Sequence, residues 1–139
     1  IGSLDGVRYY DDSISTICAT AIQALKSIPS PGSILIGGMD RGIDYSELIE
    51  YLSVDLVPHI ILMEATGKRI YEEIKNSYPA FHDPDRLHLV EHLSDAVELA
   101  KKVTPRGSAC ILSPAAASYG IFKNFEERGD AFRDLVFEL

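Results

Sequence analysis

Short apolar runs rich in β-branched residues alternate along this chain with longer segments whose apolar residues recur at helical spacing. This alternation is typical of βαβ units, in which helices cross over between parallel strands. Strands that carry helices on both faces are apolar throughout, as these runs are. We therefore predict an α/β fold: a Rossmann-like, mostly parallel sheet of about five or six strands with helices on both faces.

The spacing of the apolar residues also locates the individual elements. We expect strands at residues 7–10, 33–36, 57–63, 87–90 and 109–112. We expect helices at residues 17–28, 46–52, 68–78 and 94–103 and in the last 20 residues. The hydroxyl side chains within residues 13–16 and that of Ser94 are candidate N-caps. Gly129 falls inside the final helical pattern, where glycine costs about 1 kcal/mol relative to alanine, so we expect a break or two abutting helices there.

Composition limits the class of partner. The chain has 139 residues, enough for a single domain spanning residues 1–139. Its 21 acidic and 13 basic residues give a net charge of −8, which would repel nucleic acid. No apolar run approaches the roughly 20 residues that cross a bilayer, so we expect no membrane insertion. Cys18 and Cys110 form no CxxC motif, which favours two buried thiols in a reducing, cytoplasmic compartment.

Ligands of an open parallel sheet bind beyond the carboxyl ends of its strands. The segments expected there are residues 11–16, 37–44, 64–68 and 113–118. No two glycines stand two residues apart, so the GxGxxG dinucleotide motif is absent. Gly37 and Gly42 have P-loop spacing, but Ile43 and Asp44 follow where lysine and a hydroxyl residue are required. The sequence therefore predicts neither nucleotide cradle.

Two interpretations stay open for each polar strand end. Asp11 and Asp12 are either turn and cap residues or carboxylates displayed at the functional edge. Arg41 lies either in an ordinary glycine-rich turn or where it grips an anion. Residues 113–118 either cap a helix or bring backbone N–H groups and the Ser118 hydroxyl near a bound carboxylate or phosphate.

Other kinds of site fit less well. The HxxEH pattern of residues 88–92 straddles a predicted strand and a helix start, which favours surface histidines over metal ligands. Ser13, Ser113 and Ser118 lack the GxSxG elbow of a serine nucleophile. An acidic pair after the first strand also occurs in phospho-acceptor receiver modules. Those modules need an aspartate after the third strand and a lysine after the fifth, and this chain has neither.

Taken together, the strand-end motifs resemble one enzyme family. The motifs are residues 10–16 (YDDSIST), 36–42 (IGGMDRG), 112–118 (LSPAAAS) and 122–132 (FKNFEERGDAF). In this order they resemble the C-terminal part of the D-glutamate-adding Mur ligases, the UDP-N-acetylmuramoyl-L-alanine:D-glutamate ligases. The last motif is the most specific, because sibling ligases that add other residues differ there. The chain begins at Ile1, with no initiator methionine, which agrees with a piece of a longer protein.

The resemblance implies an ATP-dependent acid–amino-acid ligase of peptidoglycan precursor synthesis. In this family ATP phosphorylates the carboxylate of UDP-N-acetylmuramoyl-L-alanine, and the amino group of D-glutamate attacks the acyl phosphate to form an amide. Residues 1–139 would be the C-terminal, amino-acid-binding domain. ATP and Mg²⁺ would be bound mainly by a central domain outside this chain. We therefore expect a monomeric domain, inactive alone, without catalytic residues or a metal site of its own.

The family pattern also assigns roles to single residues. Thr16 and Ser118 would donate hydrogen bonds to the carboxylates of D-glutamate, and Phe125 would line that site. Asp12 would reach the ribose of ATP across the closed cleft. The contrasting hypothesis is a stand-alone receiver-like or ligand-binding α/β module without catalysis.

Two positions depart from the family pattern. Arg41 stands where many members have lysine, which keeps the positive charge but replaces a point donor with a planar fork. Ile14 stands where other members carry another lysine, so any contact made by that lysine cannot be carried over to this chain. A dicarboxylate ligand needs fixed donors and at least one cation, all the more in a chain of net charge −8.

Overall fold

The computed structural model describes residues 2–14, 16–54, 57–78, 85–118 and 121–138. Its strands are Gly2–Leu4 (β1), Val7–Asp11 (β2), Pro31–Gly37 (β3), His59–Met63 (β4), Leu87–Val90 (β5) and Ala109–Leu112 (β6). Its helices are Cys18–Ser27 (α1), Ser46–Val54 (α2), Glu64–Ser77 (α3), Leu93–Val103 (α4) and Phe125–Phe137 (α5).

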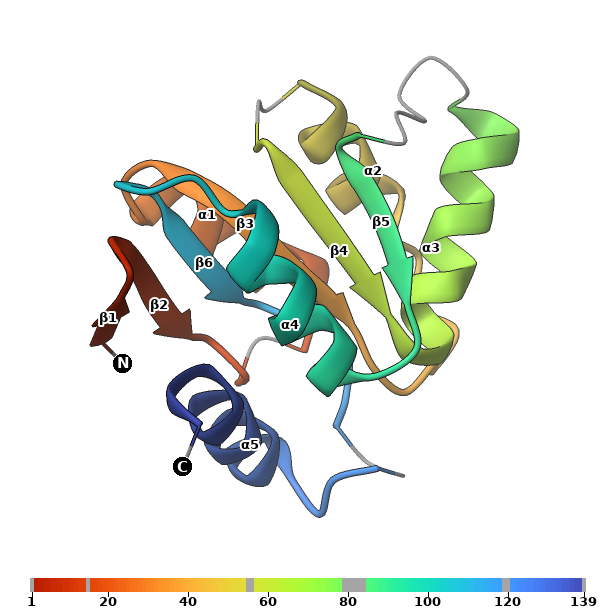
Figure 1. Ribbon diagram of the computed structural model, residues 1–139. Helices are drawn as coiled ribbons and strands as arrows, with labels where there is room; N and C mark the ends of the chain where they lie inside the picture. Colours follow the sequence, from red (N-terminus) through yellow and green to blue (C-terminus); the bar gives the residue numbers. More distant parts are fainter. Residues whose placement is uncertain (1, 15, 55–56, 79–84, 119–120, 139) are drawn as a thin grey trace.

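Within the described residues, the strands form one sheet in the order β1-β2-β6-β3-β4-β5 (Figure 1). Only β1 pairs antiparallel, with β2, and all other pairings are parallel. The last strand, β6, lies between β2 and β3. The prediction of a mostly parallel α/β sheet is therefore confirmed.

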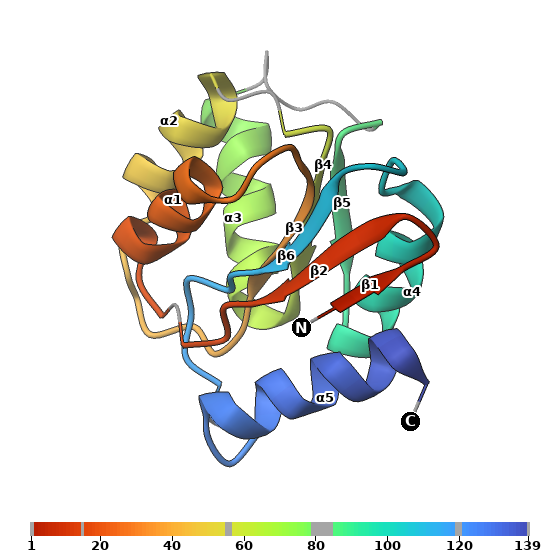
Figure 2. The same cartoon turned by 90° about the vertical axis from the view of Figure 1, so that its left-hand side faces the viewer.

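Two apolar cores cover the opposite faces of the sheet. Helices α1, α2 and α3 pack on one face, while α4 and α5 pack on the other (Figure 2). Strand β3 shows why its sequence is apolar throughout: Ile34 and Ile36 belong to the first core and Leu35 to the second, and all three are fully buried. Helix α5 lies across the carboxyl-end side of the sheet in both views.

The predicted bounds of the strands agree with the structure to different degrees. Strands β5 and β6 have the predicted bounds, and β3 is longer than predicted at both ends. Strand β1 was not predicted because its residues, GSL, are mostly exposed and show no apolar period. Residues 64–68 were expected to form a strand-end loop. They form instead the first turn of α3, which begins directly after β4.

The predicted serine and threonine N-caps are wrong. Helix α1 begins after Ile17, whose side chain makes no capping hydrogen bond. Helix α4 begins after His92, which forms a capping box with Asp95, so Ser94 lies inside the first turn. An imidazole nitrogen can accept a hydrogen bond from a free N–H group as a hydroxyl can, and a cap prediction limited to small polar residues misses it.

The break expected at Gly129 is also wrong, because α5 is continuous through that residue. Gly129 is buried, and a Cβ atom there would overlap the carboxylate of Asp11. The glycine therefore serves a close approach of α5 to the end of β2, and the tertiary contact outweighs the local cost of glycine in a helix.

Cys18 and Cys110 are buried free thiols, as predicted. Burial raises the pKa of the Cys110 thiol to about 12, which makes it unreactive at neutral pH. No helix in the described part of the chain is long and apolar enough to span a membrane.

A buried hydroxyl pair joins β3 to the end of α4. Ser33 and Thr104 are hydrogen-bonded through their side-chain oxygens at 2.7 Å. We predict that Ser33→Ala lowers the free energy of unfolding by about 1–3 kcal/mol, because it leaves the Thr104 hydroxyl unpaired. Adding Thr104→Val should recover part of that loss, since no unpaired hydroxyl then remains. Urea unfolding measures both changes, and a double variant less stable than Ser33→Ala would contradict the pairing.

Candidate functional site

The parallel strands β2, β6 and β3 end side by side, and hydrogen bonds continue beyond them. Asp11 is in register with Leu112, and Leu112 with Leu35. The Asp12 N–H group donates to the Leu112 carbonyl at 2.8 Å, and the Gly37 N–H group donates to the Pro114 carbonyl at 2.9 Å. Three of the segments expected at the strand ends, residues 11–16, 37–44 and 113–118, are therefore neighbours.

Asp12 is directly tied to the neighbouring loop. It is half-buried, and its Oδ2 atom accepts a hydrogen bond from the Ser113 hydroxyl at 2.7 Å. Burial raises the pKa of the Asp12 carboxyl, the Ser113 hydrogen bond opposes this rise, and the charge of Asp11 adds to it. The hydrogen bond fixes the direction in which the free carboxylate oxygen points. Asp12 thus joins the 11–16 loop to the 113–118 loop.

The 37–44 loop is attached to the 113–118 loop by a short bridge. Met39 and Ala117 form an antiparallel bridge in which the Met39 N–H group donates to the Ala117 carbonyl at 2.9 Å. Arg41, two residues beyond, is exposed and makes no ion pair or hydrogen bond with another residue of the described ranges. Its guanidinium is available to an anion.

A second arginine holds this loop in place. Arg69 of α3 donates to Asp40 Oδ2 at 2.9 Å and to the Ile43 carbonyl at 2.8 Å. The Gly42 N–H group and Arg69 together hold the pKa of the Asp40 carboxyl below its usual range. Arg69 also lies over the ring of Tyr45, 5.0 Å from its centroid. The charge of Arg69 is thus used within the fold, whereas that of Arg41 is not.

The remaining predicted site residues lie on the same edge. Thr16 is half-buried between β2 and α1, and Ser118 is 5% exposed at the end of the 113–118 loop. Ser118 caps no helix, because the next described helix, α5, begins after Asn124, whose side chain accepts from the Glu127 N–H group. Phe125, the first residue of α5, accepts a hydrogen bond from Ser13 through its carbonyl at 2.6 Å. These contacts unite the backbone segments that carry Asp12, Thr16 and Phe125.

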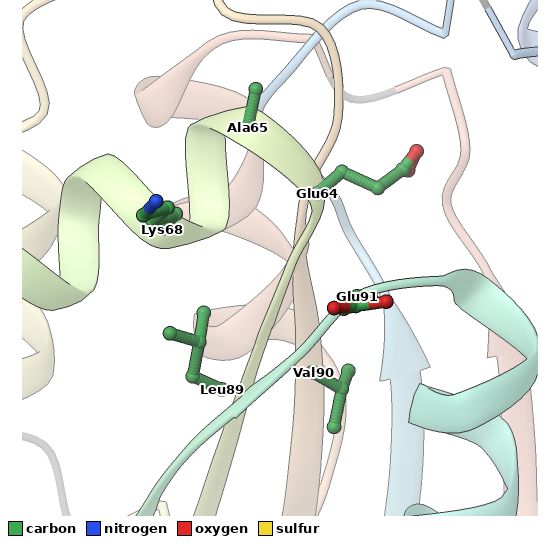
Figure 3. A pocket seen from close by; sticks show the side chains of 6 residues that line it. All are labelled: Glu64, Ala65, Lys68, Leu89, Val90 and Glu91. Carbon is green, nitrogen blue, oxygen red and sulfur yellow. The ribbon is translucent and has the colours of Figure 1, made fainter.

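A separate hollow of about 490 Å³ lies at the ends of β4 and β5 (Figure 3). Glu64 and Lys68 of α3 line one side, and the end of β5 with Glu91 lines the other. Glu64 adopts a left-handed backbone conformation with φ of 60°, a strained conformation for a residue other than glycine. Burial raises the pKa of its carboxyl, which the charges of Arg128 and His92 counteract. None of the predicted ligand-binding residues lines this hollow.

The histidines form no metal centre in the described ranges. His59 Nδ1 and His88 Nε2 are 3.0 Å apart, and burial lowers the pKa of both rings. Of the two histidines in the HxxEH pattern, His92 is exposed and His88 is half-buried. Among the described residues, no three or more His, Cys, Asp and Glu side chains come together as a metal site. His82 lies outside the described residues.

Comparison with known proteins identifies relatives of this chain. No family model matches the chain. The UDP-N-acetylmuramoylalanine–D-glutamate ligase of Caldanaerobacter subterraneus subsp. tengcongensis is 34% identical over the whole chain. The enzymes of the same name from Symbiobacterium thermophilum and Clostridium perfringens are 37% and 34% identical over 96% and 98% of it. The chain is homologous to the D-glutamate-adding Mur ligases. It spans about 30% of the length of these relatives.

The D-glutamate-adding Mur ligase homology confirms the resemblance carried by the strand-end motifs. The match extends from β1 to α5, because it includes nearly all of the chain. Whether Thr16, Arg41, Ser118, Phe125 and Asp12 bind substrate stays a prediction.

Sequence reasoning missed three charged residues of this edge. Arg69 lies inside a helical pattern, where a basic residue is normally read as solvent-exposed. Arg128 lies within the 122–132 motif but was given no role, although it is fully buried and bonded to Ser13. Glu64 was placed in a loop, and its buried carboxylate atom Oε2 has no partner in the described structure. The membership of Arg128 in a specific motif was the one available signal.

The Ser113 hydroxyl is predicted to set the ionisation of Asp12. Ser113→Ala removes a hydrogen bond that favours the carboxylate, so the already raised pKa of Asp12 should rise further. Because the folded-state pKa exceeds the unfolded value, the stabilising contribution of Asp12 is present at pH below 3.8 and is lost as the pH rises through the folded value. Ser113→Ala should move that loss to higher pH.

Carboxyl ¹³C NMR titration of Asp12 measures this change. The matched control is Ser53→Ala, which removes an exposed serine hydroxyl bonded only to the Glu50 carbonyl in α2. The control should leave the Asp12 titration unchanged. A lower or unchanged Asp12 pKa in Ser113→Ala would show that the hydrogen bond does not favour the carboxylate.

Proposed function

We propose that this chain is the C-terminal, amino-acid-binding domain of a cytoplasmic ligase that adds D-glutamate to UDP-N-acetylmuramoyl-L-alanine during peptidoglycan precursor synthesis. The observation that carries the proposal is the homology along the whole chain to enzymes of that name. The convergence of three strand-end loops at one edge supports it, because that edge is where open parallel sheets bind ligands.

The chemistry of such a ligase needs two steps. ATP transfers its γ-phosphoryl group to the carboxylate of UDP-N-acetylmuramoyl-L-alanine, giving an acyl phosphate and ADP. The amino group of D-glutamate then attacks the acyl carbon, an amide forms, a proton leaves the amine and phosphate departs. The described residues contain neither a P-loop nor a clustered metal site, so we assign the phosphates and Mg²⁺ to the rest of the ligase. This domain presents the amino acid.

We place the D-glutamate carboxylates between the Thr16 and Ser118 hydroxyls and the Arg41 guanidinium, with Phe125 beside them. An unpaired guanidinium supplies a charge-assisted, two-point contact that a carboxylate fits. Phe125 also lines a hollow of about 250 Å³ together with Ser13, Ile14 and three acidic residues, Asp11, Glu126 and Asp130. Like charges make that hollow unfavourable for an anion. We therefore place the dicarboxylate beside Arg41, outside the acidic hollow.

We assign Asp12 to the ribose hydroxyls of ATP. A carboxylate oxygen accepts hydrogen bonds from the two hydroxyls of a ribose, and the Ser113 contact leaves the other oxygen of Asp12 free for this. Asp12 then binds a different ligand from Thr16, four residues further along. One loop contributes to both substrates, which suits a domain that closes over ATP and D-glutamate together.

Exposed apolar side chains support a surface that another domain covers. Ile14, Ile17, Met39 and Ile121 are 64%, 50%, 45% and 59% exposed, and all lie in or beside the strand-end loops. Large apolar side chains gathered at one edge mark an interaction surface more often than a free one. They agree with closure of this edge onto the remainder of the ligase.

The proposal predicts which amino acid the full-length ligase prefers as its acceptor. D-Glutamate should be joined to UDP-N-acetylmuramoyl-L-alanine in preference to L-glutamate, L-lysine and diaminopimelate when all four compete. Mass spectrometry of the product and phosphate release measure the choice. Joining of another acceptor would refute the D-glutamate assignment, and the absence of any ligation would favour a binding module without catalysis.

The residue assignments predict that substitutions separate by substrate. Arg41→Ala and Ser118→Ala should raise the KM for D-glutamate, the first by roughly tenfold to a hundredfold, since a charge-assisted hydrogen bond contributes about 1.5–3 kcal/mol. The KM for ATP should move little in both variants. Asp12→Ala should raise the KM for ATP more than that for D-glutamate. Steady-state kinetics of the full-length ligase measure both constants.

The matched control for Arg41→Ala is Arg133→Ala, which removes a half-exposed arginine from α5. It should change neither constant. If Arg41→Ala and Ser118→Ala leave the D-glutamate constant within about twofold while the protein stays folded, the site assignment is wrong and these loops are structural.

A further inference from the structure

Arg128 is a fully buried arginine at the point where α5 meets the end of β2. Its Nε–H group donates to Ser13 Oγ at 2.9 Å and its Nη2 group donates to the Ser13 carbonyl at 2.8 Å. Ser13 Oγ in turn donates to the Phe125 carbonyl at 2.6 Å. The Arg128 guanidinium thus donates hydrogen bonds to both the backbone and the side chain of Ser13, in the Asp12–Thr16 segment.

The third nitrogen of Arg128 reaches the glycine loop. A Cβ atom at Gly38 would lie 3.1 Å from Arg128 Nη1 and 2.5 Å from the Ala117 carbonyl oxygen, so the guanidinium, Gly38 and Ala117 are in close approach. Gly38 is also tied to α3, since its carbonyl accepts from the Thr66 N–H group at 3.1 Å. Arg128 therefore binds the 11–16 segment directly and lies close to Gly38, where the 37–44 and 113–118 segments meet.

Stability alone does not explain an arginine at this position. Among the described residues no carboxylate lies within ion-pair distance of Arg128, and its Nη1 atom is buried without a hydrogen-bond partner. Glu64 and Asp11 are the acidic groups that face it. A buried guanidinium is costly to desolvate, and an apolar side chain of similar volume usually fills such a place at lower cost. What an apolar residue cannot do is orient Ser13.

The geometry points to Arg128 as a positioning residue that sets the Asp12–Thr16 segment against Phe125 and Gly38, and so places the contacts for both substrates. It touches neither substrate itself. The inference rests on the proposed function for the identity of the two substrates. The structural part of the inference, that the Arg128 side chain holds the Asp12–Thr16 segment in place, does not depend on the proposed function.

Kinetics of the full-length ligase test this role through Arg128→Lys, which keeps the charge but cannot bridge the two oxygens of Ser13 and reach Gly38. We expect the KM values for D-glutamate and for ATP both to rise, each by about tenfold, because small misplacements of binding groups have effects of this size. Substitution of a residue that binds only one substrate changes the KM for that substrate alone. A joint rise is the signature of a positioning residue.

A second variant keeps the test valid if Arg128→Lys does not fold. Ser13→Ala removes the Oγ contact but keeps the carbonyl contact, so both constants should rise by a smaller factor. The double variant should be no worse than Arg128→Lys alone, because the two side chains act through one interaction. The control for lost stability is Val136→Ala, which truncates a fully buried side chain of α5 outside these contacts. Val136→Ala should leave the KM values for D-glutamate and for ATP within about twofold of those of the unmodified ligase.

Hydrogen exchange supplies a readout that needs no substrate. In the full-length ligase, Arg128→Lys should speed amide exchange in residues 11–17 and in the first turn of α5, but not in α3. If exchange and both constants stay unchanged in folded Arg128→Lys, or if Val136→Ala reproduces the joint rise, the positioning role is wrong. If exchange speeds up as expected while Arg41→Ala and Asp12→Ala leave their constants unchanged, the positioning role stands and the substrate assignment fails.

Discussion

The last strand, β6, hydrogen-bonds to both β2 and β3, and the candidate site depends on this pairing. Because all three strands are parallel, their carboxyl ends meet at one edge, and the loops that follow them become neighbours. The hydrogen bonds continue past the strands, from Asp12 to Leu112 and from Gly37 to Pro114. Segments about 100 residues apart in sequence are thereby held together, as the Asp12–Ser113 contact with its separation of 101 residues shows.

The arginines at this edge differ in how the fold uses their charge. The chain carries a net charge of −8, so an anion is bound only where cations are concentrated locally. Arg69 fastens the 37–44 loop and Arg128 fastens the Asp12–Thr16 segment, each through contacts within the fold. Arg41 is left exposed between them. Two arginines therefore hold the loops in place, and the third is the one that we propose binds a carboxylate.

Predictions from local sequence were reliable where burial of apolar side chains alone sets the element. Strand β6, which is fully buried, has the predicted bounds because burial on both faces of the sheet demands an uninterrupted apolar run. Predictions from local sequence failed where the structure depends on a contact between residues distant in sequence. Gly129 was expected to break a helix, yet its missing side chain admits the Asp11 carboxylate. The N-cap of α4 was assigned to a hydroxyl residue, yet His92 and Asp95 form the capping box.

The sequence by itself determined the α/β class, the approximate element bounds and the resemblance to the D-glutamate-adding Mur ligases, because apolar periodicity and ordered motifs are local properties of the chain. Only the tertiary structure decided which loops are neighbours, that Arg128 is buried, and which of the edge arginines is unpaired. Arg128 and Ser13 are 115 residues apart, and no local pattern encodes a contact over that separation. In a helical segment an arginine reads as solvent-exposed, and only the packing of α5 against the end of β2 turns this one inward.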